Sequence, residues 1–175
     1  MALVRSLTIM AVLFAATPSL AQTMAVIEEL ERLQAEGTNL AQMHRVATQD
    51  KIDRATRALR DHDYKAAHKF AAAVTQADPN RVEAWLLLGA SQMGLQDWKR
   101  ARASYLRALR IWPAHPQAHA GLGVAMARSK DPRAAVQLAW FDDQLRACGG
   151  CYRAAELTKF KGEVQAAITA SERGP

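Results

Sequence analysis

Two prolines that lie 34 residues apart constrain this chain most strongly. Pro79 and Pro113 each close a similar stretch, QADPN and RIWPAH. A fixed spacing of this length is typical of proteins built from stacked helical hairpins, in which each repeat buries its apolar face against its neighbours. We therefore expect the residues between the two prolines to form one such hairpin.

The periodicity between the prolines is that of two amphipathic helices. Trp85, Leu88 and Gly89 fall on one surface of a helix over 82–93. A second helix is predicted over 97–112, where apolar residues recur at i, i+4, i+7 and i+8: they are Ala101, Tyr105, Ala108 and Leu109. Only 6% of the residues are aromatic, and helix-forming residues dominate these stretches, so an all-β fold is not expected.

These residues resemble the tetratricopeptide repeat. With Val82 as the first position, seven of the eight hallmark positions of that family are occupied, by Trp85, Leu88, Gly89, Ala101, Tyr105, Ala108 and Pro113. Gln92 stands where a large aromatic residue is usual. The resemblance implies that Gly89 and Ala101 let the two helices approach closely and that Pro113 ends the second helix.

Weaker copies of the pattern lie on both sides. Steps of 34 residues place three repeats at about 48–81, 82–115 and 116–147, which is close to the minimum for a stable stack. The first copy departs from the family at Lys51 and Arg54. The third copy departs from it at His119, Asp142 and Ala147.

Helical periodicity continues outside the repeats. Apolar positions predict an N-terminal helical segment over 22–47, with a short stripe that ends before Gly37. A CxxC turn and a C-terminal capping helix are predicted over 148–175. The predicted fold is therefore an all-α superhelix of about three helical hairpins with a capping helix at each end.

Residues 1–21 have the layout of a secretory signal peptide. Arg5 precedes an apolar run over 7–16, and Pro18 is followed by the small residues Ser19 and Ala21. The apolar run is about half of the ~20 residues that span a bilayer. We expect cleavage after Ala21, a mature chain without an integral membrane span, and a periplasmic or secreted location; an uncleaved anchor is the alternative.

The chain is basic, with a formal charge of +6 at pH 7. Between residues 98 and 130 there is no Asp or Glu and there are seven basic residues, Lys99, Arg100, Arg102, Arg107, Arg110, Arg128 and Lys130. For an exported protein we do not expect nucleic acid as a partner. A solvated face is the favoured interpretation of these charges, and salt-sensitive attachment to the cell envelope is the alternative.

The resemblance implies a concave groove lined by the first helix of each repeat. Carried onto this chain, the predicted partner-binding residues are Leu86, Leu87, Ala90, Met93, Ala120, Val124, Arg128, Ile52, Thr56 and Leu59. A groove that is mostly small and apolar suits an apolar or amphipathic segment of another envelope protein. The chain's own residues 24–35 or its C-terminal helix are alternative occupants.

The pair Cys148 and Cys151 encloses two glycines. A structural disulfide is the favoured interpretation in an oxidising compartment. Covalent haem would need a histidine where Tyr152 stands, and zinc would need more ligands than His115 and His119 supply. A thiol–disulfide redox component acting through the two cysteines remains the alternative.

No acid–base pair, nucleophile arrangement or phosphate-binding glycine loop is recognisable elsewhere. Gly121 and Gly123 form only a short GxG motif inside a helical stretch. We therefore predict a non-catalytic protein interaction scaffold, adaptor or assembly factor without a cofactor or a metal ion. The sequence does not indicate its oligomeric state.

Overall fold

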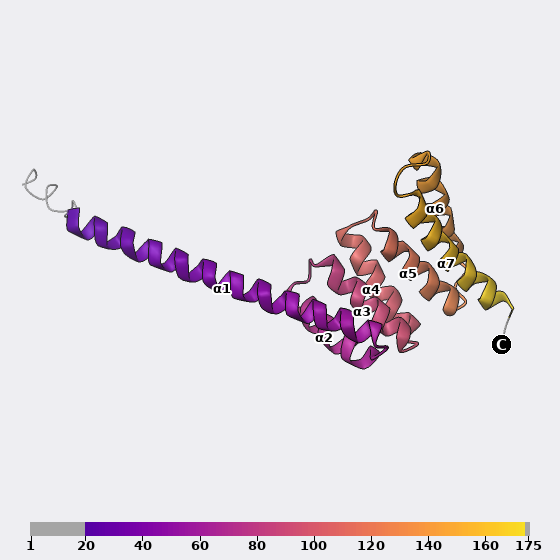
Figure 1. Cartoon of the computed structure of the whole chain (residues 1–175), viewed down its shortest axis with the longest axis horizontal. Coiled ribbons are helices and arrows are strands. Elements are labelled where there is room, and N and C mark those ends of the chain that lie inside the picture. The colour runs from indigo at the N-terminus through magenta and orange to yellow at the C-terminus, as the bar shows by residue number, and fades with distance from the viewer. Residues whose placement is uncertain (1–19, 174–175) are drawn as a thin grey trace, which may run out of the picture. The chain divides into compact units, whose positions relative to one another are not determined.

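The computed structural model describes residues 20–173, and this part of the chain is helical and contains no strand (Figure 1). The helices are α1 (Leu20–Arg60), α2 (Tyr64–Ala77), α3 (Val82–Gly94), α4 (Trp98–Ile111), α5 (Pro116–Arg128), α6 (Ala134–Cys148) and α7 (Ala154–Glu172). The predicted all-α superhelix of helical hairpins is confirmed. Most of the predicted signal peptide, residues 1–19, lies outside the described residues.

Helix α1 belongs to two compact units, which divide after Val46. The first unit contains the described residues 20–46, and the second contains the rest of α1 together with α2 to α7. The helix runs through Gly37 without a break, although the sequence predicts a stripe that ends there. One glycine inside a long helix costs only about 1 kcal/mol, so the helix-forming residues on both sides prevail. Among the described residues, no helix has the length and apolar character needed to cross a membrane.

The turns inside the three hairpins are built alike. His62, Gln96 and Lys130, spaced by 34 residues, adopt left-handed backbone conformations with φ of 58°, 60° and 56°. An aspartate follows each of them: Asp63 accepts a hydrogen bond from the backbone N–H of Ala66 (2.9 Å), Asp97 from Arg100 (3.1 Å) and Asp131 from Arg133 (3.0 Å). Asp63 and Asp97 cap α2 and α4 in this way. Asp131 instead binds the N–H of Arg133, the residue that precedes α6.

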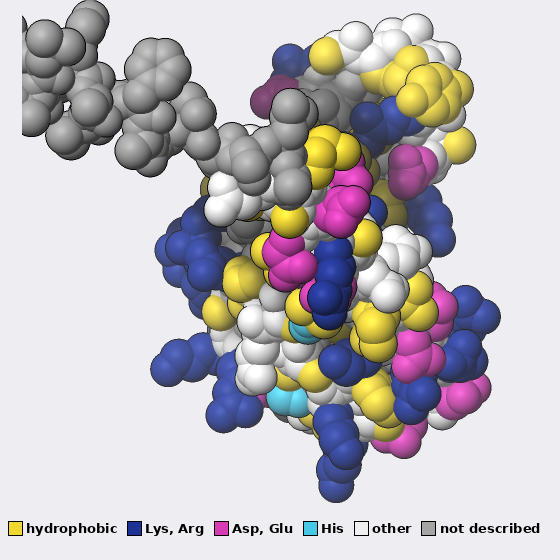
Figure 2. Space-filling view, turned by 90° about the vertical axis from the view of Figure 1, so that its left-hand side faces the viewer, with side chains coloured by type: hydrophobic (Ala, Val, Ile, Leu, Met, Phe, Trp, Pro, Cys, Tyr) yellow, Lys and Arg dark blue, Asp and Glu magenta, His cyan; other side chains and the backbone are white. Residues whose placement is uncertain are grey.

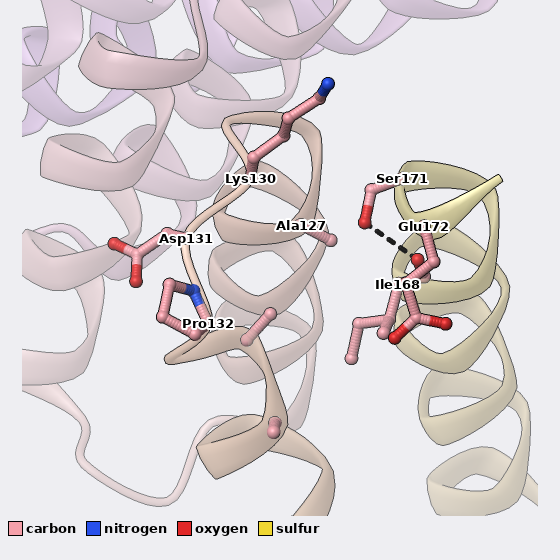
Figure 3. Close-up of a pocket in the computed structure, with 9 residues that line it drawn as sticks. Ala127, Lys130, Asp131, Pro132, Ile168, Ser171 and Glu172 are labelled. Atoms are coloured by element: carbon pink, nitrogen blue, oxygen red, sulfur yellow. Dashed lines mark hydrogen bonds between the residues drawn. The ribbon is translucent and has the colours of Figure 1, made fainter. Parts of the chain in front are cut away.

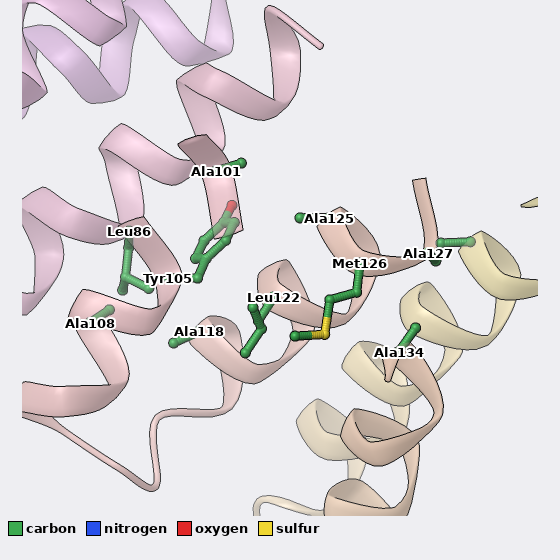
Figure 4. Close-up of a cluster of buried hydrophobic side chains, with 11 residues drawn as sticks. Leu86, Ala101, Tyr105, Ala108, Ala118, Leu122, Ala125, Met126, Ala127 and Ala134 are labelled. Carbon is green, nitrogen blue, oxygen red and sulfur yellow. The ribbon is translucent and has the colours of Figure 1, made fainter. Parts of the chain in front are cut away.

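The ring of Tyr105 holds the middle of the stack together. This α4 side chain is 5% exposed and lies among Leu86 of α3 and Ala118 and Leu122 of α5 (Figure 4). A Cβ atom added at Gly89 would lie 2.8 Å from Cζ of Tyr105, and one added at Gly121 would overlap the ring. Both glycines therefore make room for one aromatic ring, a role that the sequence did not reveal for Gly121.

Residues that depart from the repeat pattern find polar partners. The buried Gln92 accepts a hydrogen bond from the hydroxyl of Ser104 at 2.7 Å. His119 contacts the side chain of Gln137 at 2.7 Å and the carbonyl oxygen of Pro113 at 2.9 Å, and its ring stacks on Trp140. At these two positions a second polar group satisfies the side chain that replaces the usual residue.

Helix α7 closes the stack at the C-terminal end. It packs against both α5 and α6, and its residues Leu157 and Val164 contact Phe141 and Ala120. Phe141 is fully buried. The predicted capping helix therefore covers the surface of α5 that another hairpin would otherwise cover.

We expect Asp131 to contribute to stability at neutral pH and not in strong acid. Its carboxylate pairs with Arg102 of α4 at 3.0 Å and with Arg133 at 2.7 Å, and it points away from α7 (Figure 3). Hydrogen bonds from the side chain and backbone of Arg133, together with the positive charge of Arg102, lower the pKa of Asp131 from 3.8 to about 2. Because the folded-state pKa is lowered, the stabilisation is complete above pH 3.8 and is lost as the pH falls through 2.

Asp131→Asn should therefore unfold at a lower urea concentration than the wild type at pH 7, and the difference should shrink between pH 4 and pH 2. Asp143→Asn, which alters an exposed ion pair with Arg146, is the control and should show little effect at either pH. A gap between Asp131→Asn and the wild type that persists unchanged at pH 2 would contradict the role of the charge.

Candidate partner-binding groove

A cavity lies along α3 and α5. Its volume is about 650 Å³. The C-terminal parts of α3 and α5 form its sides, and the first residues of α2 and α4 complete it. The lining residues are Tyr64, Ala90, Met93, Gly94, Gln96, Trp98, Val124 and Arg128.

The packing of α2 on α3 places the aromatic wall of the groove. A Cβ atom at Gly94 would overlap the ring of Tyr64, so glycine at this position lets the ring lie against the end of α3. The hydroxyl of Tyr64 is 2.9 Å from Nδ1 of His62. Tyr64 is thus fixed at both ends, by a close contact with the backbone and by a polar partner in the preceding turn.

Met93 and Val124 form the apolar floor. Both are half-buried and pack on the core cluster around Tyr105, so each has one side on the core and one side towards the cavity. Arg128 lies exposed at the end of α5, and no acidic side chain is among the lining residues. The arrangement offers apolar and aromatic contact, an adaptable methionine and one positive charge.

Four of the ten predicted partner-binding residues line this cavity: Ala90, Met93, Val124 and Arg128. Three others, Ile52, Leu86 and Ala120, are buried in the core. Ile52 packs on Val74 and Ala84, Leu86 packs in the Tyr105 cluster, and Ala120 packs under α7. These three side chains have no free surface for a partner, because neighbouring helices cover them.

The remaining three predicted residues lie outside the cavity. Leu87 is half-buried against the small core clusters between α1, α2 and α3. The hydroxyl of Thr56 donates to the carbonyl oxygen of Ile52 at 2.9 Å, and Leu59 is half-buried in the same part of α1. Thr56 and Leu59 belong to the first hairpin, and Leu87 lies on α3 but packs towards that hairpin. The cavity lies along the C-terminal parts of α3 and α5.

Sequence reasoning missed Tyr64 and Trp98. The family pattern assigns concave positions only to the first helix of each repeat, whereas these aromatic residues open the second helices. A signal was present, since Asp63-Tyr64 and Asp97-Trp98 repeat an aspartate followed by an aromatic residue at an interval of 34 residues.

A second cavity, of about 350 Å³, lies between the α5–α6 turn and the end of α7 (Figure 3). Ala127, Pro132 and Ile168 give it apolar walls. Two of its polar side chains have partners within the chain: Asp131 pairs with two arginines, and the hydroxyl of Ser171 donates to the carbonyl oxygen of Ile168 at 2.7 Å. Aromatic residues are absent among the described residues that line it, unlike those that line the groove along α3 and α5.

Cys148 and Cys151 are joined by a disulfide in the turn between α6 and α7. Gly149 and Gly150, which lie between them, have left-handed backbone conformations with φ of 54° and 86°. No group of three metal-ligating side chains occurs among the described residues. The disulfide restrains the backbone of the turn that leads into the capping helix α7.

Several residues of the basic stretch contact groups within the chain. Arg102 pairs with Asp131, Arg100 pairs with Asp97 at 3.4 Å, and the guanidinium of Arg107 lies 5.6 Å from the ring centre of Trp85. On the face that Figure 2 shows, Lys and Arg side chains are spread between acidic and apolar ones.

Comparison with known proteins agrees with this architecture. The tetratricopeptide repeat model matches residues 52–115 and 89–149, which together make up more than half of the chain. No curated protein matches it significantly. Among solved structures, the Yersinia enterocolitica type III secretion translocator chaperone SycD, in an alternative dimer, is similar with a TM-score of 0.58 and 16% identity, over 71% of this chain and 91% of that chain. At this identity the likeness shows a common fold, and the family match shows that the chain belongs to the tetratricopeptide repeat family.

Proposed function

We propose that this protein is an exported, non-catalytic adaptor or assembly factor that holds an apolar or amphipathic segment of another envelope protein in the groove along α3 and α5. Tetratricopeptide repeats are protein interaction scaffolds, and one of the solved structures that resemble this chain is that of a chaperone. The observation that carries the proposal is the groove, in which Met93, Val124, Tyr64 and Trp98 face one cavity.

The lining of the groove favours a particular partner chemistry. A cavity of about 650 Å³ lies within the range of sites that bind small ligands or a few side chains. Met93 adapts its shape at low cost, and the two aromatic residues combine an apolar body with a polar end. With Arg128 as the charged lining residue, a segment with apolar side chains and a nearby carboxylate fits best.

The proposed location rests on the leader and is supported by the cysteines. Residues 1–21 have the layout of a signal peptide. The bonded pair of Cys148 and Cys151 is typical of an oxidising compartment. We therefore place the adaptor in the periplasm or outside the cell, where its partner must also be exposed.

Met93→Glu should reduce partner capture roughly tenfold or more, because a carboxylate on the apolar floor would lose its hydration when the partner binds. The measurement is crosslinking in intact cells followed by affinity capture of the mature protein, with helicity and melting temperature recorded in parallel. Val136→Glu, at an exposed position of α6, is the matched control and should capture the partner normally. Equal capture by Met93→Glu and the wild type would refute the groove.

A double variant, Cys148→Ser with Cys151→Ser, separates this proposal from the redox alternative. An adaptor should keep its partner without the two cysteines, since neither lines the groove. A partner that appears only as a reducible mixed disulfide would transfer the function to the cysteines.

A further inference from the structure

The N-terminal part of α1 carries a concentration of apolar side chains that no described residue of its own unit covers. Residues 22–47 are all exposed. Eight large apolar side chains in this segment are between 48% and 63% exposed: Met24, Val26, Ile27, Leu30, Leu33, Leu40, Met43 and Val46. A helix with so much apolar surface in water is stabilised chiefly by packing against another element.

The spacing of these residues identifies the kind of packing. Four of the eight, Val26, Leu30, Leu33 and Leu40, follow one another together with Gly37 at intervals of four, three, four and three residues. His44 and Ala47 continue the same spacing. This set, called here the heptad stripe, occupies alternating d and a positions of a coiled coil, with leucine at two of the d positions. Ile27 and Met43 flank it at e and g positions.

We propose that the heptad stripe pairs with the heptad stripe of a second copy of this chain in a parallel, two-stranded coiled coil. A 3.5-residue apolar period is self-complementary, since each side chain of the stripe enters the gap between residues of the facing helix. The stripe covers residues 26–47 and is roughly 33 Å long at 1.5 Å per residue. The groove of about 650 Å³ accommodates a few side chains and not a helix of this length.

The charges beside the stripe select the parallel orientation. Glu29 and Glu36 occupy successive g positions. In a parallel pair they face Gln34 and Ala41 of the second copy, at e positions, so like charges do not meet. In an antiparallel pair g positions face g positions, and the glutamates of the two chains would repel one another.

Arg32 balances the same two glutamates within its own helix. Its guanidinium lies 3.9 Å from the carboxylate of Glu29 and 3.2 Å from that of Glu36. This ion-pair row lies beside the stripe and remains in solvent in the proposed pair. Gly37 and His44, at a positions, fill the interface less well than leucine and make the association reversible.

Sedimentation equilibrium of the mature chain, residues 22–175, across the micromolar range tests the association. The wild type should show a dimer that dissociates on dilution. Leu30→Glu combined with Leu33→Glu should raise the dissociation constant by about 100-fold or more, since four carboxylates would be buried at one interface. Met24→Glu combined with Val46→Glu, at b and c positions, is the matched control and should remain dimeric.

A single Val26→Cys variant tests the orientation. In the parallel pair the two introduced thiols lie side by side and should oxidise to a covalent dimer, whereas an antiparallel pair keeps them at opposite ends. Circular dichroism should confirm that every variant keeps its helicity. A monomeric wild type, a trimer, a dimer that survives the Leu30 and Leu33 changes, or an absence of crosslinking through Val26→Cys would each overturn the proposal. Occupation of the chain's own groove by the stripe would appear as a monomeric wild type.

Discussion

Tyr105→Ala is expected to lower the free energy of unfolding by about 3–5 kcal/mol, the usual cost of removing a large aromatic side chain from a core. The ring is 5% exposed and packs between α3 and α5, and burial also raises the pKa of its hydroxyl far above the usual range. Urea denaturation followed by circular dichroism measures the loss. Leu106→Ala, at the exposed neighbouring position, should change stability little, and a loss below about 1 kcal/mol for Tyr105→Ala would contradict the central role of the ring.

A double-mutant cycle with Gly121 tests the reason for that role. Gly121→Ala places a methyl group in the space that the Tyr105 ring occupies, and overpacking of this kind costs about 1–3 kcal/mol. In the Tyr105→Ala background the methyl group has room, so the cost should disappear or change sign. Additive effects of the two substitutions would show that the contact does not couple the helices.

Phe141→Ala is expected to lower the free energy of unfolding by a similar amount, about 3–5 kcal/mol. The effect should be confined to the C-terminal end of the stack. Phe141 is fully buried and contacts Ala120 of α5 and Leu157 and Val164 of α7. In a repeat array each element contacts only its neighbours, so damage at one end need not spread. Hydrogen exchange should increase in α6 and α7 while α3 and α4 remain protected.

The exposed Val136 on the same helix provides the control for this prediction. Val136→Ala should leave exchange unchanged throughout the chain, since little apolar surface is lost from the core. Uniform loss of protection in Phe141→Ala would instead indicate that the whole repeat unit unfolds in a single step.

The fold could be predicted from the sequence because its signal is periodic. Trp85, Gly89 and Tyr105 stand at fixed positions of a pattern that can be recognised within one hairpin. The groove depends on neighbours as well. Ala120 occupies a concave position in the family pattern, yet α7 covers it. The family pattern could not predict this, because it does not specify after which repeat a capping helix follows.

The aromatic residues of the groove could not be predicted for a related reason. Tyr64 and Trp98 reach the cavity because the left-handed turns before them direct the first residues of α2 and α4 towards it. A hydrophobic pattern records which face of a helix is apolar and not the path of the turn that precedes it. Gln92 illustrates the same limit, since its partner Ser104 lies 12 residues away on the facing helix.

The matching turns at Asp63 and Asp97 also make the array modular. A 34-residue segment cut at two such turns has the same backbone geometry at both ends, so a duplicated segment joins its neighbours without a new junction. Each added repeat would lengthen the concave surface by one helical hairpin. An array with more repeats would therefore bind a longer segment of its partner. A single inserted residue within a helix has the opposite effect, because it rotates every later side chain by about 100° and exposes the core.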